Sequence, residues 1–491
     1  MPGARFTTGF CIAWAIACCT SNAAARSWSG PEARLPELGA RISVADAKTD
    51  GDGSRVLYGV KIEHGGRVIE VERMRWTGRQ VVMDRVEARH AEGPDGQLLA
   101  ATVVLRGVGS WHVFFEATGA GPSESLPMPS CAEMAGRTFS MDATNIVLVG
   151  DDDALPAILG APERLTVAHL VALNEIAVSE DGCDWNRRVG LDDVSIVAVT
   201  GARLRAARLL FDGFARETLP SPRSAPPALA GSRLTGETLS VHDSGGLVSA
   251  RLSSFLLEWV GDEPLSDVQW LRLHDKNGDA GLLHQLQESG LLEATFGARA
   301  TMEGIDIDAN RFLPSYMPHD GPDRIIGDMS LVVSLAEGNA GTVVDVDLPK
   351  VLELHLAATI GLPESEFSSP TVVSGISADI LGLKLHGLAF QFQDGLAGDI
   401  VLGLTGESLA DHLRRKLRIM ALRTERTYPS TAQDALEAVG NVLVQIVENG
   451  GAVHASPESP VTLAAALLVA TTRPERLPEL LGLQVRANGT Q

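Results

Sequence analysis

"VSIVAVTGARLRAARLLFDGF", residues 194–214, contains the pattern that decides the fold: an alternating stretch, a turn and a longer alternating stretch. Alternation of apolar and polar residues is typical of a β-strand with one buried face, and a Gly-containing turn between two such runs predicts an antiparallel hairpin. The alternation is imperfect, because Leu204, Ala206 and Arg208 would share one face. The segment therefore predicts a hairpin but does not identify its inner face.

The same unit recurs along the chain. "VEARHAEGPDGQLLAATVVLRGVG" (86–109) and "LSVHDSGGLVSARLSSFLLEWVG" (239–261) align with it, and "LKLHGLAFQFQDGLAGDIVLGLTG" (383–406) is a looser copy. Hairpins that recur without long helices between them predict a sheet that grows by addition. Helical periodicity is concentrated late, at 407–425 and 430–451. We expect an α+β fold that is β-dominated, with antiparallel hairpin repeats forming a curled or extended sheet and helices concentrated in the C-terminal third.

Composition shifts suggest four parts of the chain. Residues 1–25 are interpreted as a signal peptide, 26–222 as an N-terminal β-rich domain, and 223–407 as a second β-rich region. The Pro-rich stretch "LPSPRSAPPALAGS" (219–232) is the best linker candidate between the two β-rich parts. Residues 408–491 are expected to form a helical and strand region that packs on the sheet.

The net charge of −21 excludes one class of partner. Nucleic acids bind through clustered Lys and Arg that contact phosphates, so we expect no nucleic-acid partner. The same charge argues against docking on an anionic lipid surface. After the first 25 residues no apolar run reaches membrane-spanning length, so we expect no transmembrane helix in the mature chain.

The N-terminus predicts export. Arg5 precedes the apolar run "FCIAWAIACC", and small residues follow it, which together favour cleavage after Ala25. Lipidation at Cys18 is an alternative, because Ala17 directly precedes it; a cytoplasmic protein with an apolar start is another. We expect a periplasmic or otherwise exported protein.

Two cysteines remain in the mature chain, Cys131 and Cys183. In an oxidising compartment two thiols predict one disulfide, and separate buried cysteines are the alternative. No Cys-x-x-Cys pair lies outside the signal, so a redox role is not expected.

"HDSGG" (242–246) resembles the Gly-Asp-Ser-Gly-Gly string that carries the nucleophile of chymotrypsin-like serine proteases. Such an enzyme needs His, Asp and Ser together with backbone donors for an oxyanion. His242 stands where that family has its first glycine, and His169 is too close in sequence to Ser244 for two separate barrels. The equivalent turns of the other hairpin units contain no serine, so turn composition explains the string.

Other candidates also have plainer explanations. The pairs Asp306/Asp308 and Asp345/Asp347 are spaced to share a strand face, where an exposed polar face is favoured over a shared acid–base site. "HLRRKLR" (412–418) indicates a charged, solvated helix face, with contact to headgroups or an acidic partner as the alternative. The twelve His lack zinc-ligand spacing, so we expect no metal site. No group of candidate residues has the spacing that catalysis needs, so we also expect no catalytic residues and no cofactor.

Two resemblances add to these expectations. The segments "RLRAARLLFDGF" and "LVSARLSSFLLEW" resemble the β-repeats of AsmA-like envelope proteins, which implies a curled sheet with an apolar groove and a link to lipid transfer. The closing block, with Pro457, Pro460, Pro474 and "LLG" at 480–482, resembles uncharacterised proteobacterial periplasmic proteins of DUF2125-like type. That family implies compartment and fold but supplies no catalytic residues.

These observations favour a non-enzymatic cell-envelope protein that binds an apolar ligand, such as a lipid, or an envelope partner on a curled β-sheet. The alternative is a structural or scaffold protein that contacts partners through sheet edges. A hydrolase with an unrecognised site is the third hypothesis.

Overall fold

The computed structural model describes residues 31–37, 39–64, 66–77, 80–90, 97–107, 111, 114, 138–149, 162–179, 182–218, 228–265, 296–312, 322–336, 338–361, 372–373, 376–377, 383–425, 441 and 444–487. The chain forms two compact units. Unit 1 comprises Met1–Val248 and Pro264–Asp267, and unit 2 comprises Ser249–Glu263 and Val268–Gln491. The finer division at residues 25, 222 and 407 stays a prediction.

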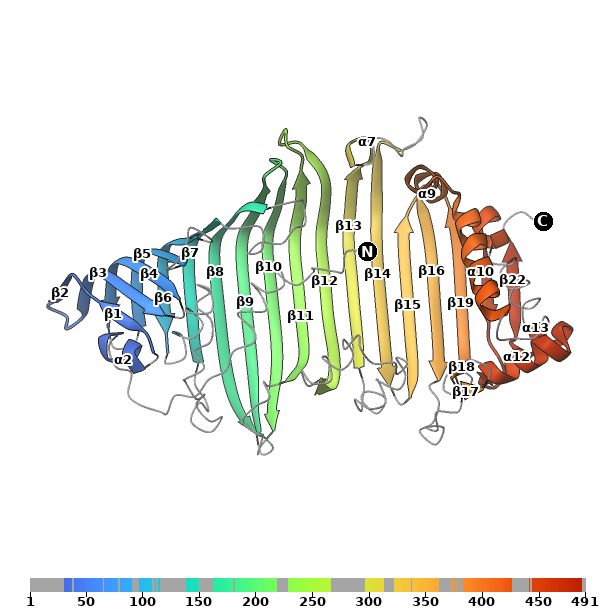
Figure 1. Ribbon diagram of the computed structural model, residues 1–491, viewed down its shortest axis with the longest axis horizontal. Helices are drawn as coiled ribbons and strands as arrows, with labels where there is room; N and C mark the ends of the chain where they lie inside the picture. Colours follow the sequence, from blue (N-terminus) through green and yellow to red (C-terminus); the bar gives the residue numbers. More distant parts are fainter. Residues whose placement is uncertain are drawn as a thin grey trace. The chain divides into compact units, whose positions relative to one another are not determined.

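Unit 1 is an antiparallel sheet in which successive strands pair in chain order from β3 to β11, while β1 and β2 both pair with β3 (Figure 1). A short helix, α2 (Pro31–Glu37), precedes it. The strands are β1 (Arg41–Ser43), β2 (Asp46–Thr49), β3 (Arg55–His64), β4 (Arg67–Trp76), β5 (Gln80–His90), β6 (Gln97–Arg106), β7 (Thr138–Val149), β8 (Pro162–Ser179), β9 (Gly182–Ala198), β10 (Arg203–Thr218) and β11 (Ala228–His242).

Unit 2 continues with antiparallel strands and holds the longer helices. Strands β12 to β16 pair in chain order, β16 pairs with β19, β19 pairs with β20 and β21, and β20 pairs with β22. The strands are β12 (Val248–Leu265), β13 (Phe296–Asp308), β14 (Arg324–Ala336), β15 (Asn339–Leu348), β16 (Leu352–Gly361), β17 (Val372–Val373), β18 (Ile376–Ser377), β19 (Lys384–Asp394), β20 (Gly451–Ala455), β21 (Val461–Thr462) and β22 (Leu483–Ala487).

The described helices of unit 2 follow mainly after β19. Apart from α7 (Ala309–Phe312), they are α9 (Ala397–Thr405), α10 (Leu409–Glu425), residues 444–449, α12 (Leu463–Thr472), the 3₁₀ turn η2 (Pro474–Arg476) and α13 (Leu477–Leu480). The β-dominated α+β class, the antiparallel hairpin character and the C-terminal concentration of helices are therefore confirmed (Figure 1).

The hairpins predicted at 86–109 and 194–214 are present as β5–β6 and β9–β10. The looser copy at 383–406 is wrong in its second half, where the chain forms α9 instead of a second strand. The Asp394 carboxylate accepts a hydrogen bond from the Gly398 N–H (3.1 Å), which satisfies a backbone donor in the first turn of the helix. This bond supports the start of α9, which contains the apolar residues of 397–405.

In each strand from β3 to β11, the alternation of inward and outward side chains is interrupted at one position. These positions lie side by side across the sheet. In β9, Asp192 and Asp193 lie outward in succession between the core-facing Leu191 and Val194. The register is the same on both sides of the interruption, so one residue per strand is left without a direct cross-strand partner. We call this row the seam; all its residues are exposed, and they are Gly59, Glu72, Arg85, Ala101, Asn145, Ala168, Asp193, Ala207 and Thr238.

Backbone conformation explains how the seam forms. On the odd-numbered strands β3 to β11 the seam residue has a left-handed φ between 50° and 55°. A residue in this conformation leaves the ladder and turns the following side chain to the other face, as in a β-bulge. On β6, β8 and β10 the opposing seam residue is alanine. Core-facing residues therefore change from odd-numbered to even-numbered positions, or the reverse, where a strand crosses the seam. The apolar side chains on both sides of the seam thus face the same core.

The inward rows on both sides of the seam form the core of unit 1. The row next to it includes Val60, Val71, Val86 and Val194, each no more than 5% exposed. Leu35 of α2 and the edge-to-face pair of Trp111 and Phe114 (centroids 5.9 Å apart) belong to the same cluster. One face of the unit 1 sheet is therefore buried, and the outward face carries the charged residues.

The left-handed seam predicts an unusual response to glycine. An L-residue in this conformation costs about 1–2 kcal/mol, whereas glycine in a regular strand costs about 0.5–1 kcal/mol relative to alanine. Thr238 has φ 51°, while Thr235 on the same strand has no positive φ. We expect Thr238→Gly to leave stability unchanged or raise it by up to about 1 kcal/mol, and Thr235→Gly to lower it by about 1 kcal/mol. Urea denaturation of both variants tests this; equal losses would contradict it.

Candidate functional site

The sheet of unit 2 has one face made almost entirely of apolar side chains. Residues directly opposite each other in an antiparallel ladder share a face, so the register defines the rows. One row contains Leu257, Ala300, Leu331, Val344, Leu356 and Phe390. The apolar face, with its two flanking rows, also includes Phe255, Trp259, Ala298, Met302, Met329, Val333, Thr342, Val346, Leu354, Ala358, Leu388 and Phe392.

The opposite face of the same strands is polar or charged at many positions. Glu258 pairs in register with Arg299, and the Ser330 and His355 side chains both contact the Asp345 carboxylate. The His355 Nδ1–Asp345 Oδ1 distance is 2.6 Å. The strands of unit 2 are therefore amphipathic.

The C-terminal helices cover one end of the apolar face. Ile446, which is 1% exposed, packs with Phe392 and Val453, and Leu409 at the start of α10 joins the same cluster. Phe390 lies at the edge of this contact. This end of the apolar face is therefore closed by the protein itself.

Over β12, β13 and β14 the apolar face meets solvent. Met302 is 44% exposed and Leu331 is 41% exposed, although both lie in the middle of their strands. Leu257, Met329 and Val333 are exposed to a similar degree. Soluble monomers rarely expose contiguous apolar patches of this kind unless the patch binds something. The exposed part of the apolar face is the candidate binding site.

The protease-like string lies in a turn, as expected. Gly246 N–H donates to the Asp243 carbonyl (2.9 Å), and Leu247 N–H donates to the Asp243 carboxylate (2.9 Å). The ring of His242 contacts Ser240 and the Gly246 carbonyl. None of these contacts involves the Ser244 hydroxyl.

His169 is elsewhere on the sheet. Its ring nitrogens contact Asp142 (3.1 Å) and Asp192 (3.4 Å) in the outward row beside the seam. That row reaches β11 at Glu237, about 17 Å along the strand from His242 at ~3.4 Å per residue. The structure therefore does not bring His169 and Ser244 together.

The turn can be tested by substitution. Gly246 has φ 80°, and a methyl group on its Cα would meet no other atom within 4 Å, so only backbone strain opposes replacement. We expect Gly246→Ala to lower the free energy of unfolding by about 1–2 kcal/mol, and Ser244→Ala to leave stability and ligand binding unchanged. Thermal denaturation measures the first effect. A functional loss specific to Ser244→Ala would restore a chemical role for this turn.

The acidic pairs do not form shared acid–base sites. Asp306 forms an ion pair with Arg324, and Asp308 forms one with Arg311 at 3.1 Å. In the other pair, Asp345 contacts His355. Within the described ranges, no group of three or more His, Cys, Asp or Glu side chains is arranged to bind a metal ion.

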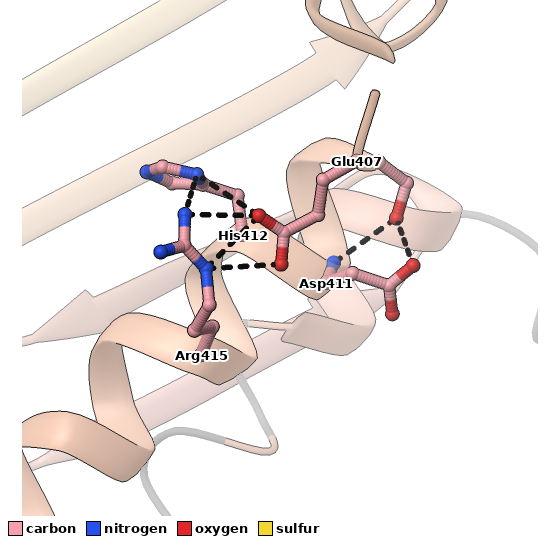
Figure 2. A network of polar contacts seen from close by, with 5 residues as sticks. Glu407, Asp411, His412 and Arg415 are labelled. Carbon is pink, nitrogen blue, oxygen red and sulfur yellow. Dashed lines mark hydrogen bonds and ion pairs between the residues drawn. The ribbon is translucent and has the colours of Figure 1, made fainter. Parts of the chain in front are cut away.

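The basic stretch 412–418 lies on α10, and a polar network begins that helix (Figure 2). Ser408 caps it: its hydroxyl accepts from the Asp411 N–H (3.0 Å) and donates to the Asp411 carboxylate (2.7 Å). Arg415 and His412 both contact the Glu407 carboxylate, at 2.9 and 3.5 Å.

Arg414 is paired as well. It contacts Asp411 at 2.9 Å and also Glu448. The hydrogen bond from Ser408, followed by that from Arg414, lowers the pKa of the Asp411 carboxyl, and the hydrogen bonds to Glu448 and Asp411 raise the pKa of Arg414. These guanidinium groups therefore serve the helix start and its contact with residues 444–449.

Some predicted features lie outside the described residues. These include the signal peptide, Cys18 and Cys131; Cys183 lies on β9, but its side chain is not described. The disulfide therefore stays a prediction. No helix in the described part of the chain has the length and apolarity required to cross a membrane.

Comparison of the chain with protein-family models, with curated proteins and with solved structures finds no match. We therefore infer function from the residues of the chain. The sequence carried a signal for the apolar face in the alternation of "MSLVVSL" (329–335) and "LELHLAA" (352–358). Alternation alone could not reveal that the apolar side stays partly exposed.

Proposed function

We propose that the protein is a non-enzymatic, exported binding protein of the cell envelope that holds the acyl chains of a lipid on the apolar face of unit 2. The exposed rows over β12–β14 are the observation that carries the proposal. The rows there offer methyl, thioether and aromatic groups, while the main-chain polar groups are used in the ladders. Such a surface provides few hydrogen-bonding groups for a polar ligand and favours contact with hydrocarbon.

The shape of the surface also favours acyl chains. Three adjacent strands present side chains of different lengths in parallel rows, and two of the exposed ones are Met302 and Met329. Methionine adapts to irregular apolar ligands because its side chain is unbranched and polarisable. The resemblance of the hairpin units to AsmA-like repeats and the signal-like N-terminus are consistent with this proposal.

A pair of neighbouring substitutions tests it. Leu331→Glu places a carboxylate on the apolar face, and Val332→Glu places the same charge on the opposite face of the same strand, beside Arg299. Since burying an unpaired carboxylate against hydrocarbon is costly, we expect Leu331→Glu to weaken binding of a fluorescent fatty acid by at least about ten-fold, and Val332→Glu to leave it within about two-fold. Titration of the full chain measures both affinities.

Three other outcomes would count against the proposal. These are the absence of saturable fatty-acid binding by the unmodified chain, an equal loss in both variants, and native mass spectrometry without a co-purifying lipid.

A scaffold role is the second candidate. Strand β22 pairs on one side with β20, and no second ladder partner is seen for it in the described part of unit 2. Val485 on this strand is 47% exposed. An open strand edge can accept another strand from a partner. The Ser456 N–H donates to the Gly482 carbonyl, and bond directions alternate along the strand, so the Val485 N–H faces the open edge. Proline substitution of Val485 would disrupt pairing at that edge and leave fatty-acid binding unchanged, which separates the two functions.

A further inference from the structure

The outward face of unit 1 contains a groove of about 640 Å³ across β8 to β11. Two rows of the register line it: Arg164, Val197 and Arg203 form one, and Thr166, Ser195, Arg205 and Ser240 form the next. The seam residues Asp193, Ala207 and Thr238 form its third side. We call it the arginine groove.

Three arginines occupy neighbouring positions of the sheet in the lining of the arginine groove. Arg203 and Arg205 are two residues apart on one face of β10, which separates their Cα atoms by about 7 Å. Arg164 lies two strands from Arg203 in the same row, about 10 Å away at the usual strand spacing. The lining carries these three cations and the Asp193 carboxylate, a net charge of +2 (3 − 1). This charge stands out in a chain of net charge −21.

Several other outward arginines of unit 1 are neutralised by carboxylates. Arg73 pairs with Asp84 at 2.6 Å and Arg188 with Asp212 at 2.7 Å. Within the described part of the chain, no ion pair joins Arg164, Arg203 or Arg205 to a carboxylate. Three like charges held together with a single carboxylate in the lining raise the energy of the folded state. An external anion would remove that repulsion.

Arg203 provides a second, independent observation. Its Nε is buried and has no hydrogen-bond partner. Buried donors are normally satisfied, because an unmade hydrogen bond costs about 1–3 kcal/mol. The surrounding hydroxyls are partly engaged: Thr166 donates to the Ser195 carbonyl (3.4 Å), and Ser240 contacts His242 (3.0 Å). Because the Nε is closed off from solvent, a ligand oxygen in the groove would supply this acceptor once the Arg203 side chain turns outward on binding.

From this geometry we propose that the arginine groove binds the phosphate group of a small ligand. A phosphate dianion matches the net charge of the lining, and its several oxygens can accept from guanidinium and hydroxyl donors together. The groove lies on unit 1, whereas the apolar face belongs to unit 2. This inference goes beyond the proposed lipid binding and does not depend on it.

Binding to the purified full chain tests the site. The probes are inorganic phosphate and a short-chain phosphatidic acid below its micelle concentration, each titrated by calorimetry at constant ionic strength. We expect saturable binding that Arg203→Gln weakens at least ten-fold. Arg233→Gln is the charge-matched control, because Arg233 is exposed on β11 outside the groove lining. We expect it to change the affinity less than two-fold.

The variants also separate the contributions of charge and geometry. Arg203→Lys keeps the charge but removes the Nε donor, so we expect an intermediate affinity. If Arg203→Gln fails to fold, Arg205→Gln replaces it, since Arg205 is exposed and should be tolerated.

The binding results show whether the phosphate group comes from a lipid headgroup or a free phosphate. They also show whether the proposal fails. Saturable binding of both probes indicates that the phosphate group alone suffices, and binding of phosphatidic acid alone indicates a lipid headgroup. Absence of saturable binding of either probe at about 10 mM, or an equal loss in Arg203→Gln and Arg233→Gln, would overturn the proposal. Fatty-acid binding that persists in Arg203→Gln would show that the apolar face acts separately.

Discussion

The architecture of unit 1 depends on one backbone constraint, the pair of consecutive outward residues in each strand from β3 to β11. Without it, strict alternation would place the apolar residues on one side of the seam in the core and those on the other side in water. The left-handed residues on the odd-numbered strands invert the parity, and a single continuous core results. The four non-glycine residues in this conformation, Arg85, Asn145, Asp193 and Thr238, each carry a local conformational cost, which the burial of valine, leucine and methionine beyond the seam offsets.

The same constraint shapes the outward surface. Because two successive residues of each strand face outward at the seam, two adjacent rows of side chains are exposed there. The row beside the seam contains many charged residues, namely Arg73, Asp84, His169, Asp192 and Arg208. Most of these charges neutralise one another in cross-strand pairs. On the other side of the seam, no described carboxylate pairs with Arg164, Arg203 or Arg205, and the arginine groove lies there. The unpaired cations stand out because the pairing beside them is so regular.

The strands of unit 2 are also amphipathic, but their apolar face is only partly buried. Among the described residues of unit 2, helical side chains cover its apolar face where Leu409 and Ile446 pack against Phe392 and its neighbours. Over β12 to β14 the equivalent side chains remain partly in solvent. A sheet of this kind gains less from burial than unit 1 does, and a hydrocarbon ligand would supply the missing contact area. The two units thus present opposite chemistries, charged on the outward face of unit 1 and apolar on unit 2.

Local patterns in the sequence were enough to predict the β-dominated class, the hairpins at 86–109 and 194–214, the late helices, and the turn at 242–246. These are local features, set by alternation over a few residues and by turn glycines such as Gly246 with its φ of 80°. The imperfect alternation at Leu204, Ala206 and Arg208 was visible, yet it could not be interpreted from one strand. Its meaning lies in the register: "LDDV" (191–194), "AARL" (206–209) and "GETL" (236–239) become one row only when the strands pair. Tertiary structure alone decided which face is buried, which carboxylates reach which arginines, and that Arg164, Arg203 and Arg205 share a groove, because these properties depend on contacts between residues distant in the chain.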